Sequence, residues 1–413
     1  MSRNTVDTCA WLVFTANTGR PLPSHAQRRA SDRAGLSGPV DDEKQEHRVK
    51  KIIRAAALTG AVALALAACG SAPEESDSTA GGGGDTGASD FKACMVSDSG
   101  GFEDKSFNQS GAEGLDRAKS ELGIEEVKVE STAETDFTPN IDSLIQQDCN
   151  LIIGVGFLLE DPIQQAAEAN PDIEFALIDS AFTDDEFNPV TLDNAKPLLF
   201  NTQEAAYLAG YVAAGTSTTG TVATFGGIQL PSVSIFMDGF ADGVTKYNED
   251  NGTAVKVLGW DKEAQTGSFT GDFENQTNGQ NLAKGFIDQG ADVIMPVAGP
   301  VGLGAAAAAQ EAGNVAIVGV DADWFETSPD YSSIILTSVM KEIGQAVFDT
   351  VKEASEGNFS SDPYVGTLEN EGIGIAPFHD FDSVVPDEVK TAVEDLKAQI
   401  ISGDLVVESP SQN

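Results

Sequence analysis

From about residue 90 onward, short apolar runs alternate with longer stretches of helical periodicity. The longer stretches repeat apolar positions every three or four residues, as amphipathic helices do, for example over 108–122, 204–215 and 277–289. Strands that alternate with helices predict an α/β architecture, with parallel sheets that helices cover on both faces. The series is long enough for two such sheets, with a change of lobe near 193–202. The apolar runs predict buried strands at 91–96, 151–155, 173–178, 221–225, 255–258, 293–297 and 315–320.

Glycine and aspartate gather directly after these predicted strands. Asp98, Asp179 and Asp321 each end or follow an apolar run, and Gly299 follows another. In open parallel sheets, ligands bind beyond the carboxyl ends of the strands. The pattern therefore predicts a polar small molecule held between two lobes.

Charge divides the chain near residue 69. Residues 1–68 hold 10 basic and 6 acidic residues, whereas the remaining 345 hold 14 basic and 59 acidic residues, out of a formal net charge of −41. Such an acidic body excludes nucleic acid as a direct partner, because phosphate binding needs clustered Lys and Arg.

The joint between these two pieces has the features of a lipoprotein signal peptide. A basic segment, 48–54, precedes an apolar stretch at 55–65, and small residues then lead to Cys69. We expect Cys69 to carry the lipid that anchors the protein to the outer side of the cell membrane. Residues 1–68 are then an upstream extension plus signal peptide, and we expect translation to start near Val49. The Gly/Ser-rich segment 69–89 is expected to be a flexible tether.

Two cysteines fall in the expected folded part, Cys94 and Cys149, each in an apolar strand-like run. An extracytoplasmic compartment permits a disulfide between them, and parallel strands of one sheet would bring them together. Two buried free thiols are the alternative.

The segment 96–108, Val-Ser-Asp-Ser-Gly-Gly-Phe-Glu-Asp-Lys-Ser-Phe-Asn, carries the most specific pattern. Its glycine pair permits positive φ or close backbone approach, and Ser106 or Asn108 is expected to cap the following helix. The segment resembles the opening motif of the basic membrane protein family, which comprises substrate-binding lipoproteins of ABC importers, including purine nucleoside receptors. The resemblance continues in order through 149–157, 175–179, 226–240, 290–299, 319–323 and 336–341.

This resemblance implies a type I periplasmic-binding-protein fold, with two Rossmann-like lobes joined by a hinge. We place the first lobe at 90–195 with about 323–347, and the second at 196–322 with about 348–413. It also implies a monomer that binds a small molecule, most simply a nucleoside, and docks on an ABC permease in the membrane. No cofactor is implied.

The family's nucleoside site implies a base stacked between two rings, here Phe107 and Phe273, with Phe269 and Phe236 as alternatives for the second ring. Asp98 with its neighbour Ser99, Asn108 and Asp179 would meet polar edges of the ligand. Asp321 and Lys341 would meet the ribose hydroxyls, and Gly299 would allow close backbone approach. The family commonly has Gln where this chain has Trp324.

Two alternatives remain open: a sugar or other small polar ligand for import or sensing, and an extracytoplasmic hydrolase that acts on nucleosides with two carboxylates. Against an enzyme, the mature chain has one histidine, His379, outside the glycine and aspartate turns, and no Gly-x-Ser-x-Gly elbow. The glycine loop 299–304 lacks the Lys-Ser/Thr pair of a P-loop. Asp321 and Asp323 do not form a calcium-loop pattern, so we expect no metal.

Overall fold

The computed structural model describes residues 90–412, except Asp185 and Phe187. The chain divides into units of residues 1–80 and 81–413, and every described residue belongs to the second unit. The predicted leader, the lipidated Cys69 and the tether, residues 1–89, lie outside the described residues. In the described part, no helix is both long and apolar enough to span a bilayer.

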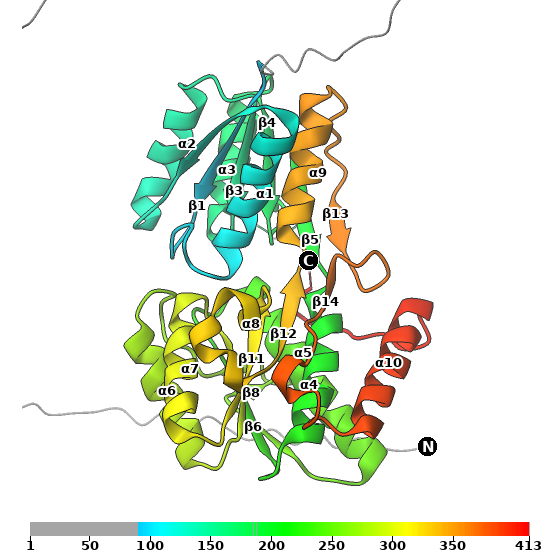
Figure 1. Cartoon of the computed structure of the whole chain (residues 1–413). Coiled ribbons are helices and arrows are strands. Elements are labelled where there is room, and N and C mark those ends of the chain that lie inside the picture. Colours follow the sequence, from blue (N-terminus) through cyan, green and yellow to red (C-terminus); the bar gives the residue numbers. More distant parts are fainter. Residues whose placement is uncertain (1–89, 185, 187, 413) are drawn as a thin grey trace, which may run out of the picture. The chain divides into compact units, whose positions relative to one another are not determined.

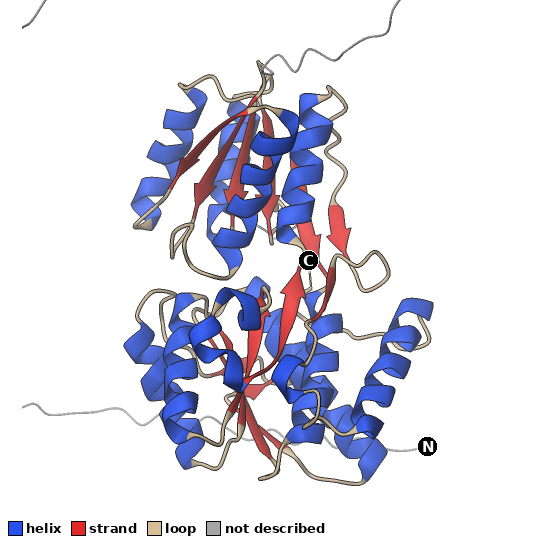
Figure 2. Cartoon of the chain, viewed as in Figure 1, coloured by secondary structure: helices blue, strands red, loops and turns tan. Residues whose placement is uncertain are grey.

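Two six-stranded sheets with helices on both faces form two lobes, as the alternating pattern predicted (Figure 1, Figure 2). In lobe 1 all strands are parallel, and their order is β13 (Tyr364–Gly366), β5 (Ala195–Phe200), β4 (Glu174–Ile178), β3 (Leu151–Val155), β1 (Lys92–Ser97), β2 (Glu125–Val129). Its helices are α1 (Phe107–Leu122), α2 (Phe137–Ile145), α3 (Glu160–Ala169) and α9 (Ile343–Ser355).

Lobe 2 repeats this arrangement. Its strand order is β14 (Ile373–Ile375), β12 (Ile335–Lys341), β11 (Ala316–Asp321), β10 (Val293–Val297), β6 (Thr221–Gly226), β7 (Lys256–Leu258). Only β14 runs antiparallel to its neighbour in this sheet, and β8 (Trp260–Asp261) with β9 (Thr266–Gly267) forms a separate hairpin. Its helices are α4 (Thr202–Thr216), α5 (Pro231–Asn251), α6 (Gln276–Asp288), α7 (Pro300–Ala312), α8 (Trp324–Thr327) and α10 (Asp387–Ser402).

The central strands of both sheets are buried on both faces. Every residue of β3 and of β10 is buried, which explains why both read as continuous apolar runs. The strands predicted at 151–155 and 293–297 coincide with β3 and β10. The carboxyl ends of the two sheets point toward each other between the lobes (Figure 1).

The chain crosses between the lobes after Phe200, after Lys341 and after Gly366. The predicted lobe boundaries are wrong in part. Lobe 1 extends beyond residue 195, because it includes all of β5. The assignment of 323–347 to lobe 1 and of 348–413 to lobe 2 does not hold either. β12 pairs with β11 and so belongs to lobe 2, whereas β13 pairs with β5 in lobe 1 and α9 lies beside α1.

Cys94 on β1 and Cys149, just before β3, form a disulfide with a Cα–Cα distance of 6.0 Å. β1 and β3 are parallel neighbours, with Cys94 opposite Ile152, so the sheet register brings the two cysteines together. Both side chains are buried in the lobe 1 core. Lobe 2 contains no cysteine.

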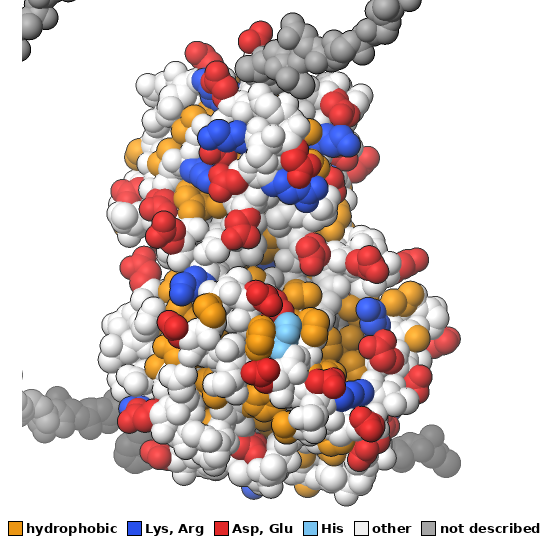
Figure 3. Space-filling model, in the orientation of Figure 1, with side chains coloured by type: hydrophobic (Ala, Val, Ile, Leu, Met, Phe, Trp, Pro, Cys, Tyr) orange, Lys and Arg blue, Asp and Glu red, His pale blue; other side chains and the backbone are white. Residues whose placement is uncertain are grey.

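Acidic side chains are spread over the visible face of both lobes, and Lys and Arg are fewer (Figure 3). This distribution fits the excess of acidic residues in the sequence.

Candidate functional site

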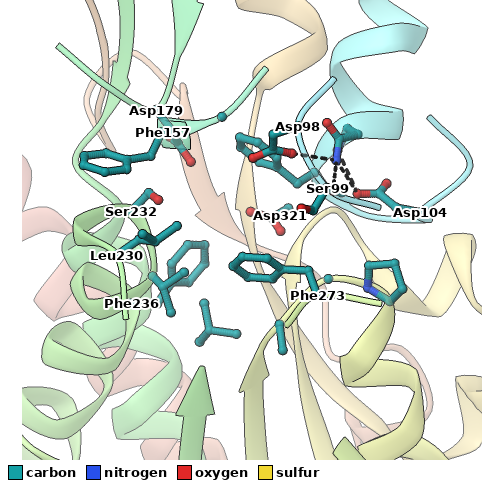
Figure 4. Close-up of a pocket in the computed structure, with 18 of the residues that line it drawn as sticks. Asp98, Ser99, Asp104, Phe157, Asp179, Leu230, Ser232, Phe236, Phe273 and Asp321 are labelled. Atoms are coloured by element: carbon teal, nitrogen blue, oxygen red, sulfur yellow. Dashed lines mark hydrogen bonds between the residues drawn. The ribbon is translucent and has the colours of Figure 1, made fainter. Parts of the chain in front are cut away.

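One cavity lies where the carboxyl ends of the two sheets face each other (Figure 4). All nine residues predicted for the site line it. The space between its lining atoms is about 540 Å³, including the part open to solvent. Positions far apart in the sequence meet here because each follows a strand of one of the two sheets. The nine are Asp98, Ser99, Phe107, Asn108, Asp179, Phe273, Gly299, Asp321 and Lys341.

The loop between β1 and α1 builds a hydrogen-bonded corner of this cavity. The amide nitrogen of Asn108 donates to the Ser99 carbonyl oxygen at 2.9 Å, to Asp98 Oδ1 at 3.3 Å and to Asp104 Oδ2 at 3.4 Å (Figure 4). Gly156, at the end of β3, lies so close to the Asp98 carboxyl that a side chain there would clash. The corner is therefore held rigidly by its own polar groups.

Asp104 caps α1, in place of the predicted Ser106 or Asn108. Its carboxylate accepts hydrogen bonds from the backbone N–H groups of Ser106, Asn108 and Gln109 at 2.9–3.0 Å. Three satisfied N–H groups at a helix start stabilise both the helix and the charge of the carboxylate. The Ser106 side chain is thus free to bond elsewhere.

Lys341, the last residue of β12, links the two lobes. Its ammonium contacts the carboxylates of Asp179 in lobe 1 and of Asp321 in lobe 2, the latter at 3.0 Å. Ser106 Oγ of lobe 1 donates to Asp321 Oδ2 at 2.8 Å across the same boundary. Burial alone would lower the pKa of Lys341, but the two carboxylates raise the pKa overall, so the side chain is a cation.

Asp179 and Asp321 occupy matching places at the ends of β4 and β11, and both have left-handed backbones, with φ of 64° and 69°. Aspartate tolerates this region better than most residues, yet it remains uncommon outside glycine. Strained backbone of this kind concentrates at functional sites.

Aromatic rings line the cavity from both lobes. Phe107 and Phe157 come from lobe 1, and Phe236 and Phe273 come from lobe 2. Figure 4 shows Phe236 and Phe273 across the cavity from Asp98 and Asp179. Lys341 Nζ lies 4.8 Å from the centre of the Phe107 ring and 4.9 Å from that of Phe236.

The remaining candidate ring, Phe269, does not line the cavity. It packs edge-on against Trp260 with 6.1 Å between ring centres. Trp324 is buried beneath the site and donates its indole N–H to the Val320 carbonyl oxygen at 2.9 Å. It therefore belongs to the packing below the cavity and does not line it.

Gly299 has the positive φ of 51° and begins the turn into α7, with Pro300 as the first helical residue. Gly302 and Gly304, near the start of α7, leave no room for side chains, because they pack against Trp324 and the Gln276 backbone. The turn at Gly299 and the start of α7 are therefore close-packed at the cavity wall.

Asp98 has an unusual electrostatic environment. The pKa of its carboxyl is raised to about 8, mainly by burial, with the hydrogen bond from Asn108 opposing the shift and the charges of Asp104 and Asp179 adding to it. Among the described residues, no ion pair involves Asp98, and no group of three or more His, Cys, Asp or Glu is placed to hold a metal.

Several lining residues were not predicted. Most are apolar and cannot be told from core residues in a sequence. Signals existed for others, since Gly156-Phe157 follows a predicted strand and Ser232-Val233 falls in a family-like segment. Phe236, which lines the cavity, is predicted only as an alternative second ring, and the missed residues are Asp104, Gly156, Phe157, Leu230, Ser232, Val233, Val297, Ala298 and Pro300.

Comparisons with known proteins agree with the family resemblance. Residues 91–410 match the family described as ABC transporter substrate-binding protein PnrA-like. The chain is 30% identical to the ABC transporter nucleoside-binding protein BmpA of Lactococcus lactis subsp. cremoris, over 87% of this chain and 99% of that protein. It is also 30% identical to basic membrane protein A of Borreliella burgdorferi, over 80% of this chain and 92% of the relative.

A solved structure of an ABC transporter system solute-binding protein from Aeropyrum pernix K1 superposes with a TM-score of 0.69. The sequence identity is 27%, and the match covers 77% of this chain and 94% of that one.

Proposed function

The chain belongs to the PnrA-like family of ABC transporter substrate-binding proteins, and on that premise we propose that its cavity binds a purine nucleoside. The observation that carries this proposal is the placement of Phe107 and Phe273, rings from opposite lobes, on one cavity with a lysine-bridged pair of carboxylates. The two rings suit a flat heterocycle, and the lysine with its two carboxylates suits a polyol.

The base is assigned to the rings. A purine offers two π faces, and stacking on an aromatic side chain contributes about 1–3 kcal/mol per base. The apolar residues Leu230 and Val233 beside Phe236 exclude water from this part of the cavity. Hydrogen bonds to the base edge then come from the corner formed by Asp98 and Asn108.

The ribose is assigned to the cluster of Asp179, Asp321 and Lys341. A carboxylate is an acceptor only and can take two hydroxyl donors, whereas the ammonium donates to hydroxyl oxygens. Because these three side chains already order one another, little freedom is lost when the sugar binds.

The same cluster couples binding to lobe closure. Two contacts join the lobes and form only when the lobes are closed on each other. They are the hydrogen bond from Ser106 to Asp321 and the ion pair between Lys341 and Asp179. A ligand that touches both sides adds to these contacts, and the closed form is the one that docks on the permease. Release follows from opening, with no covalent step.

The protein is proposed to work as a monomer held at the outer face of the cell membrane by a lipid on Cys69. The support is the signal-like segment before Cys69 and the tether that follows it. A lipid-anchored body on a tether remains next to its permease while it captures ligand.

Titration calorimetry of the purified protein against nucleosides, free bases and pentoses tests the ligand assignment. We expect purine nucleosides to bind more tightly than free bases, and pentoses alone to bind weakly. Tight binding of a sugar with no response to any nucleoside would overturn the proposal. Chromatography of the same mixtures after incubation is expected to show intact nucleoside, and free base among the products would favour the hydrolase.

A further inference from the structure

The cavity contains more carboxyl groups than its cation can balance. Lys341 is already in contact with Asp179 and Asp321. Asp104 is held by three backbone N–H groups. Asp98 is only 7% exposed, and it has neither a cation nor a set of backbone N–H donors around its carboxyl. No ion pair to it exists in the described part of the chain. A buried carboxylate without a cation or several donors is costly.

The groups around Asp98 also disfavour a negative charge there. Asp104 lies in the loop before α1, Asp179 follows β4, and Asp321 stands on β11 across the cavity. Lys341 on β12 is the one cation that lines the cavity, and its contacts are with the other two strand-end carboxylates. The end of β3 contributes only Gly156 and Phe157, which carry no charge.

Asn108 beside Asp98 adds no positive charge. Its side-chain nitrogen is surrounded by three oxygens, those of Asp98, Ser99 and Asp104. In the described part of the chain, the contact from this nitrogen to Asp98 Oδ1, at 3.3 Å, is the one side-chain hydrogen bond to the Asp98 carboxyl. A single long hydrogen bond from a shared donor does not offset the cost of burying a carboxylate charge.

We propose that Asp98 lines the cavity as a neutral carboxylic acid that donates a hydrogen bond to the base. This inference rests on the proposed function. It deepens that function by naming the group that the site recognises: a hydrogen-bond acceptor on the base, such as a ring nitrogen of adenine. If Asp98 were ionised, its carboxylate would only accept hydrogen bonds and would select a donor on the base.

Two features support this protonation state. The pKa of Asp98 is raised to about 8 by burial, so a neutral side chain is expected near pH 7. The raised pKa of Lys341 keeps that residue charged over the same range, so it does not titrate together with Asp98. The ligand affinity should then depend on pH through Asp98.

Calorimetry with adenosine is the test, because adenine does not titrate in the alkaline range. We expect the affinity of the wild-type protein to be constant up to about pH 8 and to fall by up to about tenfold per pH unit above it. Titrations in two buffers of different ionisation enthalpy, at about pH 9, should show uptake of up to one proton on binding. Affinity that rises with pH, or proton release near pH 7, would overturn the proposal.

Two variants assign the effect to Asp98. Asp98→Asn cannot ionise, so it should lose both the pH dependence and the proton uptake, whatever its affinity. Asp395→Asn, an exposed position on α10, should retain the wild-type profile. A pH profile that persists in Asp98→Asn would assign the titration to another group and refute the inference.

The protonation state can be measured without any ligand. The infrared difference spectrum between the wild-type protein and Asp98→Asn at neutral pH should contain the carbonyl band of a protonated carboxylic acid, and a carboxylate band alone would refute the inference. If no nucleoside binds, the proposed function and the donor role fail together, while this spectrum still decides the protonation state.

Discussion

Strand for strand, the two lobes correspond, yet they line the cavity with different chemistry. β1 is followed by Asp98, whereas the matching β6 is followed by Gly227, against which the Phe273 ring packs without room for a Cβ. Only the ends of β4 and β11 agree, where Asp179 and Asp321 share the same left-handed backbone. Each lobe contributes two rings, but lobe 1 adds mainly carboxyl and amide groups, whereas lobe 2 adds mainly aliphatic side chains.

This difference shows how one repeated scaffold can bind an amphipathic ligand. The strand ends provide equivalent positions, and Gly in place of Asp at such a position replaces a polar contact with space for a ring. The exception in lobe 2 is Lys341, whose charge is balanced by one carboxylate from each lobe. The predictions below test this division between the lobes, beginning with the residue that connects them.

Lys341→Met should have the largest effect. It leaves the buried carboxylates of Asp179 and Asp321 without their cation, and breaking a buried ion pair typically costs about 3–5 kcal/mol. Urea unfolding measures the loss, and calorimetry should show that nucleoside binding is abolished. Lys390→Met removes a more exposed ion pair with Asp382 and should cost less than about 1 kcal/mol. Equal losses of unfolding free energy in the two variants would show that the ion pairs of Lys341 between the lobes stabilise the protein no more than an exposed ion pair does.

Cys94→Ala with Cys149→Ala tests whether lobe 1 depends on a covalent link that lobe 2 lacks. The disulfide spans 55 residues, and removing such a cross-link should lower the stability by about 2–4 kcal/mol. Hydrogen exchange should speed up in β1, β3 and α2 and change little in β6 and β10. Equal loss of protection in both lobes would contradict an effect confined to lobe 1.

The sequence predicted the strands that consist of apolar residues and missed those with polar ones. β5 contains Lys196 and Pro197, and β12 contains buried Thr337, Ser338 and Lys341. The polar groups of β12 are satisfied by contacts distant in sequence, such as Thr337 Oγ1 to the Ala376 carbonyl at 2.7 Å. No local pattern contains that information, so the lobe boundaries at the later crossings could not be predicted.

The polar half of the site was easier to predict than the apolar half. Asp98, Asp179 and Asp321 stand out because charged residues rarely end a buried strand without a function. Val297, in contrast, reads as one more apolar residue of a buried strand, and only the fold places its side chain at the cavity. The choice between Phe269 and Phe273 likewise needed the fold, because both follow the same short hairpin.

Phe273→Ala tests the apolar half of the comparison. Loss of one stacking ring should weaken nucleoside binding by about 1–3 kcal/mol, which is about 5- to 150-fold in affinity. Phe269→Ala is the matched control, since its ring packs on Trp260 outside the cavity; it should lower stability and retain affinity. The reverse result would exchange the roles of the two rings.

The last prediction concerns the acid excess of lobe 1 and how stability depends on pH. An unfolded aspartate has a pKa near 4, and the folded Asp98 has a pKa of about 8. Between these values the folded state holds a proton that the unfolded state has lost. The stability from this group is therefore complete below about pH 4 and falls by about 1.4 kcal/mol per pH unit until about pH 8.

Asp98→Asn removes this slope because its amide does not titrate. Its free energy of unfolding relative to the wild-type protein should therefore rise steadily from pH 5 to pH 8, as measured by urea unfolding at each pH. Asp395→Asn should show no such trend. If the difference between Asp98→Asn and the wild-type protein stays constant with pH, Asp98 is ionised in the folded state. The polar side of the cavity would then consist of acceptors, and lobe 1 would recognise donors alone.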